Sequence, residues 1–175
     1  DLEGLNGHTP ADIRRAAWKA VVAGGGGFSV RHNTLHCPRG ITECDRYFPI
    51  AQAIDLLDSE SWLRHVEPFI AETLGDAYQS MHPTPELVDP QGGKFALADD
   101  RRTQLLFLLM GVGDTWDGGD GGAVTLRLGG VTGRLTGSWF DPRTGTLSPA
   151  GSFDGGQEHR VAPPSAEDWL LWLRL

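Results

Sequence analysis

Residues 123–148 read AVTLRLGGVTGRLTGSWFDPRTGTLS and predict two β-strands joined by tight turns. Alternate positions between 124 and 128 are apolar, which is typical of a strand with one buried face. A second strand is expected over 133–140. It is followed by the turn Asp141-Pro142-Arg143-Thr144-Gly145, whose residue types favour a tight reversal.

Strands of the same kind are expected on both sides of this stretch. They cover residues 95–98, 103–110, 146–148, 157–161 and 169–173. The segment 99–102, Asp-Asp-Arg-Arg, lies between the first two and predicts a hairpin turn. Short strands at this spacing predict an all-β antiparallel sandwich over residues 94–175.

The beginning of the chain has a helical pattern. Thr9 is a suitable N-cap, and Pro10 fits the first helical position. Apolar residues then recur at helical spacing over 13–21, and several are alanines, which indicates close packing against a sheet. Gly24 is the expected stop signal.

A short buried strand is expected over 28–30, directly after the glycines. Helices are expected over 50–57 and 59–74. The order helix, strand, helix predicts an α/β segment of the kind found at the end of a (β/α)8 barrel.

The stretch 75–93 is rich in proline and polar residues, which is typical of a boundary between domains. We therefore predict an α/β barrel portion at 1–78, a linker at 79–93 and a β-sandwich at 94–175.

Composition excludes several classes of protein. The chain has 175 residues, 39% of them hydrophobic, and a formal net charge of -8 at pH 7. A protein this acidic, without a basic stripe, lacks the positive charge that nucleic acid or an anionic membrane surface requires. The longest apolar runs are also too short to span a bilayer. We expect neither a nucleic-acid partner nor a membrane partner, and the two cysteines leave the compartment open.

Polar residues gather behind the expected strand at 28–30. His32, Asn33 and His36 carry groups that hydrogen-bond sugar hydroxyls, so we predict that they bind substrate. A loop whose histidines satisfy local backbone groups is the alternative. Glu3 lies before the first helix, where a barrel places catalytic carboxylates, and is the catalytic candidate; an exposed terminal charge is the alternative.

Two other clusters resemble metal sites in residue type only. Cys37 and Cys44 lie near two histidines, but their spacing does not match the paired pattern of a zinc site. Three aspartates in the glycine-rich loop 113–122 lack the spacing of a calcium-binding EF-hand and fit a hairpin loop better. We predict no metal site and no cofactor.

Several stretches together resemble one enzyme family. They are DLEG at 1–4, PADIRRAAW at 10–18, AGGGGF at 23–28, RHN at 31–33, WFDPRTG at 139–145 and DWLL at 168–171. The first four are similar to the end of the barrel in apiosidase-like glycoside hydrolases. The last two resemble the C-terminal β-sandwich that carries a collagen-binding name in that family.

The resemblance implies roles for some residues. Family members tend to carry the motif Glu-Pro-x-Tyr-Glu-Gly here; Glu3-Gly4 matches its end, with Leu2 in place of the aromatic residue. The first glutamate of the motif, the stronger catalytic candidate, would precede Asp1. His32 and Asn33 match the polar pair that lines the sugar pocket, whereas 37–47 departs from the pattern.

A complete barrel takes about 250 residues. The remainder of the barrel is therefore expected on the same gene product or on another chain. We expect part of a glycoside hydrolase that acts on polysaccharide or glycan side chains, with carbohydrate as substrate. The alternative is a non-catalytic sandwich module that binds carbohydrate or a matrix protein.

Overall fold

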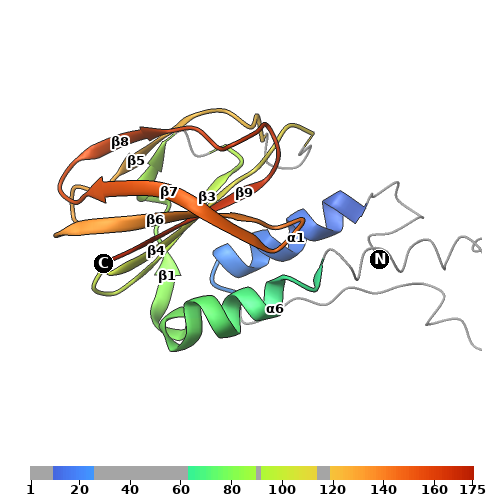
Figure 1. Cartoon of the computed structure of the whole chain (residues 1–175), viewed down its shortest axis with the longest axis horizontal. Helices are drawn as coiled ribbons and strands as arrows, with labels where there is room; N and C mark the ends of the chain where they lie inside the picture. Colours follow the sequence, from blue (N-terminus) through green and yellow to red (C-terminus); the bar gives the residue numbers. More distant parts are fainter. Residues whose placement is uncertain (1–9, 26–62, 90–91, 114–118) are drawn as a thin grey trace, which may run out of the picture.

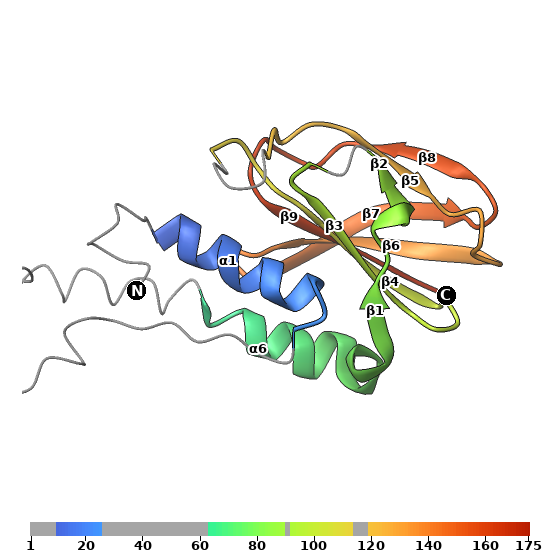
Figure 2. The same cartoon turned by 180° about the vertical axis from the view of Figure 1, so that it is seen from behind.

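The computed structural model describes residues 10–25, 63–89, 92–113 and 119–175. Figures 1 and 2 show three layers: a small sheet, a larger sheet, and helices packed on the outer face of the larger sheet. The strand expected over 28–30 and the helix expected over 50–57 lie outside the described residues, so the barrel portion stays a prediction.

The larger sheet has six strands in the order β1-β3-β4-β9-β6-β7, and each pair of neighbours is antiparallel. The strands are β1 (Met81–Pro83), β3 (Lys94–Asp99), β4 (Gln104–Leu109), β6 (Arg134–Asp141), β7 (Thr146–Asp154) and β9 (Trp169–Arg174). β7 is longer than the sequence pattern predicts. Its pairing with β6 continues past a register shift at Gly137/Ser138, which keeps the outer strand paired as far as Asp154.

The smaller sheet has three strands: β2 (Val88–Asp89), β5 (Val124–Arg127) and β8 (Glu158–Val161). β5 lies in the middle and is antiparallel to both neighbours. The predicted antiparallel β-sandwich is confirmed by these two facing sheets.

β4 shows why the larger sheet must be covered on both faces. Its sequence, QLLFLL, is apolar at nearly every position, so both faces of the strand carry apolar side chains. Leu105, Phe107 and Leu109 point into the core between the sheets. Leu106 and Leu108 point the other way, into a second core beneath the helices.

α1 (Pro10–Val22) begins at the proline that the sequence predicts as the first helical residue. It ends as predicted at Gly24, whose φ of 75° belongs to the left-handed region that favours glycine. The amide of Gly24 donates to Val21 O and the amide of Gly25 donates to Ala20 O, the two bonds of a Schellman cap.

The second helical segment is continuous but changes its winding. It runs through α6 (Val66–Pro68), the π-helix η1 (Phe69–Leu74) and the 3₁₀ helix η2 (Gly75–Ser80). Pro68 has no N–H to donate, and the segment continues beyond it with the wider winding. Val66 and Phe69 are buried, as their helical spacing predicts.

Aromatic rings fix the helices on the sheet. Trp18 of α1 contacts Phe69 and Phe140 edge-on, with ring centroids 5.5 Å apart in each case. The rings of Phe69 and Phe140 are 4.3 Å apart. Because the three rings come from α1, η1 and β6, one contact cluster joins both helical segments to the larger sheet.

A buried ionic cluster fixes α1 at its other end. Asp168, which is 2% exposed, accepts from Arg14 Nη2 at 2.6 Å and from Arg15 Nε at 3.0 Å. It also accepts from the backbone N–H of Gly111 at 2.8 Å, while Arg15 Nη2 donates to Val112 O. The carboxylate at the start of β9 therefore holds two arginines of α1 and the loop after β4.

The segment expected as a linker, 79–93, has a structural role within the described residues. β1 pairs with β3 in the larger sheet, and β2 pairs with β5 in the smaller one. β1 is an edge strand with Pro83 at its end, a place where a missing N–H donor is tolerated. The proline-rich composition thus marks strand ends at this point, and the proposed division at 1–78 and 94–175 stays a prediction.

We predict that Asp168→Asn lowers the free energy of unfolding by about 3–5 kcal/mol, because two buried arginines lose their counter-charge. Urea unfolding measures the change. Asp154→Asn is the matched control, since Asp154 is 56% exposed and 3.7 Å from Arg134, and we expect a change within about 0.5 kcal/mol there. Equal effects of the two substitutions would show that the cluster does not hold the fold.

Candidate functional site

All four residues predicted to form the sugar site lie outside the described part of the chain. Glu3 precedes α1, and His32, Asn33 and His36 fall between Gly25 and Leu63. Two loop residues considered as cation ligands, Asp114 and Asp117, lie outside it as well. The third aspartate of that loop, Asp120, accepts a hydrogen bond from the buried Lys94 at 2.7 Å.

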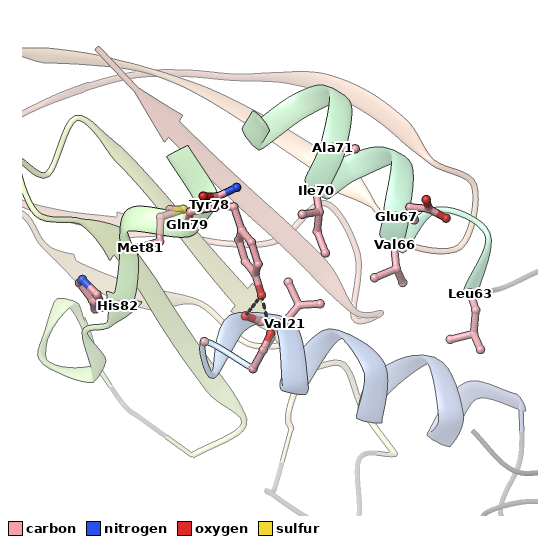
Figure 3. A pocket seen from close by; sticks show the side chains of 12 residues that line it. Val21, Leu63, Val66, Glu67, Ile70, Ala71, Tyr78, Gln79, Met81 and His82 are labelled. Atoms are coloured by element: carbon pink, nitrogen blue, oxygen red, sulfur yellow. Dashed lines mark hydrogen bonds between the residues drawn. The ribbon is translucent and has the colours of Figure 1, made fainter. Parts of the chain in front are cut away.

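A groove with a volume of about 920 Å³ lies between α1 and the segment 63–82 (Figure 3). Its apolar lining comes from both helical segments and from β1: Val21, Leu63, Val66, Ile70, Ala71 and Met81. Gly24 and Gly25 form part of its wall, and Glu67, Tyr78, Gln79 and His82 are its polar members. Several of these residues also belong to the core beneath the helices, so the groove opens directly from that core.

Tyr78 fixes the width of the groove. Its hydroxyl lies 3.0 Å from Val21 O and 2.9 Å from Gly25 O, so it bonds the last turn and the cap of α1 (Figure 3). Burial raises the pKa of Tyr78 above its ordinary value, which keeps the phenol protonated as a donor. The groove walls are thereby tied together by a polar contact at one end.

The groove by itself lacks the groups for hydrolysis. Among the described residues that line it, Glu67 is the sole carboxylate, whereas glycoside hydrolysis uses two. The described residues also contain no group of three histidine, cysteine, aspartate or glutamate side chains placed to hold a metal ion. The chemistry of the groove is therefore that of an apolar binding surface.

The turn 141–145 of the WFDPRTG stretch contains a cluster of polar contacts. Asp141 accepts from Arg143 through Nε at 2.8 Å, Nη2 at 2.9 Å and the backbone N–H at 2.9 Å. Burial opposes ionisation, but these bonds and the guanidinium charge lower the pKa of Asp141 below its ordinary value. The guanidinium also lies 5.4 Å from the ring centroid of Trp169. With its donors used in this way, the cluster stabilises the turn.

The same turn contacts the second helical segment. Gly145 has a φ of 74°, and a Cβ at this position would collide with the ring of His65. Burial is the main cause of the lowered pKa of His65, and Arg64 lowers it further. The close approach explains why glycine stands at this point of the turn.

Sequence reasoning did not single out the interactions that organise these surfaces. Arg14, Arg15 and Asp168 stand in the sequence only within the longer stretches that resemble the enzyme family. A usable signal was present: two adjacent arginines occur in a helix expected to pack against a sheet, and one aspartate begins an otherwise apolar strand. A buried charge is costly unless an opposite charge lies beside it, so the two arginines and the aspartate are expected to pair.

Comparisons with known proteins give one domain family and two solved structures with a similar fold. Residues 119–174 match the family described as "Putative collagen-binding domain of a collagenase". A solved structure named "Glycoside hydrolase" aligns over 95% of this chain with a TM-score of 0.71 and 18% identity. A glycoside hydrolase family 5 protein from Bacteroides vulgatus ATCC 8482 aligns over 96%, with a TM-score of 0.70 and 17% identity.

At this level of identity the two structures show a shared fold. The chain spans 37% of the length of each of them. No curated protein matches the sequence significantly. None of the helices in the described residues combines the length and the apolar character that crossing a bilayer requires.

Proposed function

We propose that the chain is the C-terminal part of a glycoside hydrolase, in which the sandwich is an accessory domain joined to the end of a (β/α)8 barrel. The observation that carries the proposal is the extent of the fold match. Glycoside hydrolase structures align with 95–96% of this chain, helices included, and continue well beyond it. The match of 119–174 to a domain family supports the accessory role of the sandwich.

The groove supports the same proposal. α1 and α6–η1 bury one set of side chains on the larger sheet, including Trp18 and Phe69. They also line an apolar hollow of about 920 Å³. In a (β/α)8 barrel the helices cover parallel strands rich in branched apolar side chains. The proposed occupant of the groove is therefore the apolar outer face of barrel strands.

The catalytic roles in this proposal are those that the sequence motifs predict. Hydrolysis takes two carboxylates, one to protonate the leaving oxygen and one to act as nucleophile or base. Glu3 is proposed as one of them, and the partner glutamate would precede Asp1. His32, Asn33 and His36 are proposed to hydrogen-bond the sugar hydroxyls.

A second function comes from a different class. The family description of 119–174 names a collagen-binding domain, which favours a non-catalytic module that binds carbohydrate or a matrix protein. Hydrolytic activity separates the two proposals, because a pure binding module has none.

The decisive experiment measures hydrolysis of a glycan panel by the full-length protein and by Glu3→Gln. Loss of one catalytic carboxyl group is expected to lower the rate by about 10²–10⁴-fold, because proton transfer in the transition state is lost. Glu158→Gln is the control with unchanged activity, since Glu158 is exposed on β8 of the smaller sheet. Full activity of Glu3→Gln would remove its catalytic role, and absence of hydrolysis on every glycan would favour the binding module.

The groove occupant is tested by Ala71→Arg in the full-length protein. Ala71 lines the groove and is exposed in this chain, so barrel strands packed there would leave no room for arginine. We expect a loss of about 1–3 kcal/mol in the free energy of unfolding, measured by denaturant titration. Glu72→Arg is the matched control because its neighbour Glu72 is exposed and does not line the groove. Equal stability of both variants would mean that nothing packs against the groove.

A further inference from the structure

A second, smaller pocket opens where the helical layer stops short of the end of the larger sheet. It has a volume of about 310 Å³, at the lower end of the range for small-molecule sites. Its lining consists of Thr73, Thr103, Gln104, Trp172, Arg174 and Leu175. All six residues belong to the described part of the chain.

Strand alternation explains the polar lining. Leu106 of β4 and Trp172 of β9 face the helical layer, so Gln104 and Arg174 face the same side two residues further along. Gln104 and Arg174 are also paired across the two strands. The last residue pair across β4 and β9 therefore presents an amide and a guanidinium to this side, whereas the preceding pairs present apolar side chains.

The amide of Gln104 has a fixed orientation. The indole Nε1 of Trp172 lies 3.2 Å from Gln104 Oε1. Because an indole N–H only donates, it must face the amide oxygen, which directs the amide NH₂ donors away from the indole. Gln104 thus supplies donors to the pocket and keeps its acceptor occupied.

Arg174 is also held in place. Its guanidinium carbon lies 4.4 Å from the centroid of the Trp172 ring, a stacking contact that restricts the long side chain. Within the described residues it forms no ion pair, unlike Arg102, Arg127 and Arg143. A fork of guanidinium donors therefore remains available beside the pocket.

None of the six lining residues is an aspartate or a glutamate. The nearby carboxylate of Asp99 is used internally, since it accepts from Thr103 Oγ1 at 2.8 Å and from the Gln104 N–H at 2.6 Å. Thr103 donates its hydroxyl proton to Asp99, so its oxygen remains an acceptor for a ligand hydroxyl. The pocket combines two donor groups for an anion with a hydroxyl acceptor, and Leu175 adds a small apolar surface.

We propose that this pocket binds the carboxylate of a uronic acid residue in a polysaccharide. A guanidinium fork matches a carboxylate in bidentate geometry, and the Thr103 oxygen suits a ring hydroxyl of a sugar. The choice of a sugar acid rests on the proposed glycoside hydrolase function, whereas the donor-rich geometry does not. The accessory sandwich would then hold acidic polysaccharide near the barrel.

The test is calorimetric titration of the full-length protein with D-glucuronate and D-galacturonate. The neutral counterparts D-glucose and D-galactose, together with acetate, serve as comparison ligands. We expect a uronate to bind at least ten-fold more tightly than its neutral counterpart and than acetate. Equal binding of acetate would reduce the pocket to a simple anion site, and equal binding of the neutral sugar, or no uronate binding, would overturn the proposal outright.

Three variants locate the binding. Arg174→Gln removes the guanidinium fork and is expected to weaken uronate binding at least ten-fold. Gln104→Glu keeps an acceptor for the Trp172 N–H while replacing the donors by a negative charge, and is expected to abolish binding. Arg160→Gln changes an exposed arginine of β8 and is expected to have no effect. Unchanged affinity in Arg174→Gln contradicts the proposal.

These measurements are independent of hydrolysis. Loss of activity in Glu3→Gln leaves uronate binding intact under this proposal, because the pocket lies at the end of β4 and β9. An inactive full-length protein that still binds uronate through Arg174 would refute the hydrolase function and keep the pocket. An active protein that does not bind uronate would keep the hydrolase function and refute the binding proposal for the pocket.

Discussion

The structure depends on one buried carboxylate. Asp168 accepts from Arg14, Arg15 and the backbone of Gly111, and all three side chains of the cluster are at least nine-tenths buried. Removing any one of these charges would leave the others in a medium where an uncompensated ion costs several kcal/mol. The arrangement also requires close chain approach, because a Cβ at Gly111 would lie 2.5 Å from the carbonyl carbon of Glu167. One ionic cluster thus sets the position of α1, of the loop after β4 and of the start of β9.

That constraint determines what the helical layer offers to other molecules. With α1 fixed by Asp168 at one end and by Tyr78 at the other, its apolar side chains are divided between the sandwich and the groove. The helix pair is therefore apolar both toward the sandwich and along the groove, and the proposed barrel strands would cover the groove. The helical layer ends before the last residue pair of β4 and β9. This leaves Gln104 and Arg174 accessible as part of the polar pocket. Both candidate surfaces therefore follow from how far the helices extend across the larger sheet.

Much of the sandwich is predictable from sequence, because strand alternation and turn residues are local signals. The pattern in 123–148 predicts β5, β6 and the turn between β6 and β7, and the limits of α1 follow from Pro10 and Gly24. Sequence patterns do not predict β1, β2 or the pairing of Arg14 with Asp168, and each has a physical reason. Proline-rich composition predicts a linker at 79–93, and it carries no signal for β1 and β2, which need only a few residues each to pair at a sheet edge. Arg14 and Asp168 are 154 positions apart, so no local pattern connects them. The catalytic and substrate-binding candidates lie outside the described residues and stay predictions.

The central claim is that the Asp168 cluster makes the helices and the sandwich one cooperative unit. Native-state hydrogen exchange measures this directly, since the opening free energy of each amide reports the unit that must unfold to expose it. The account predicts that the buried amides of α1 exchange with the same opening free energy as those of β4 and β9. An α1 that opens at much lower free energy while β4 and β9 stay protected would contradict it.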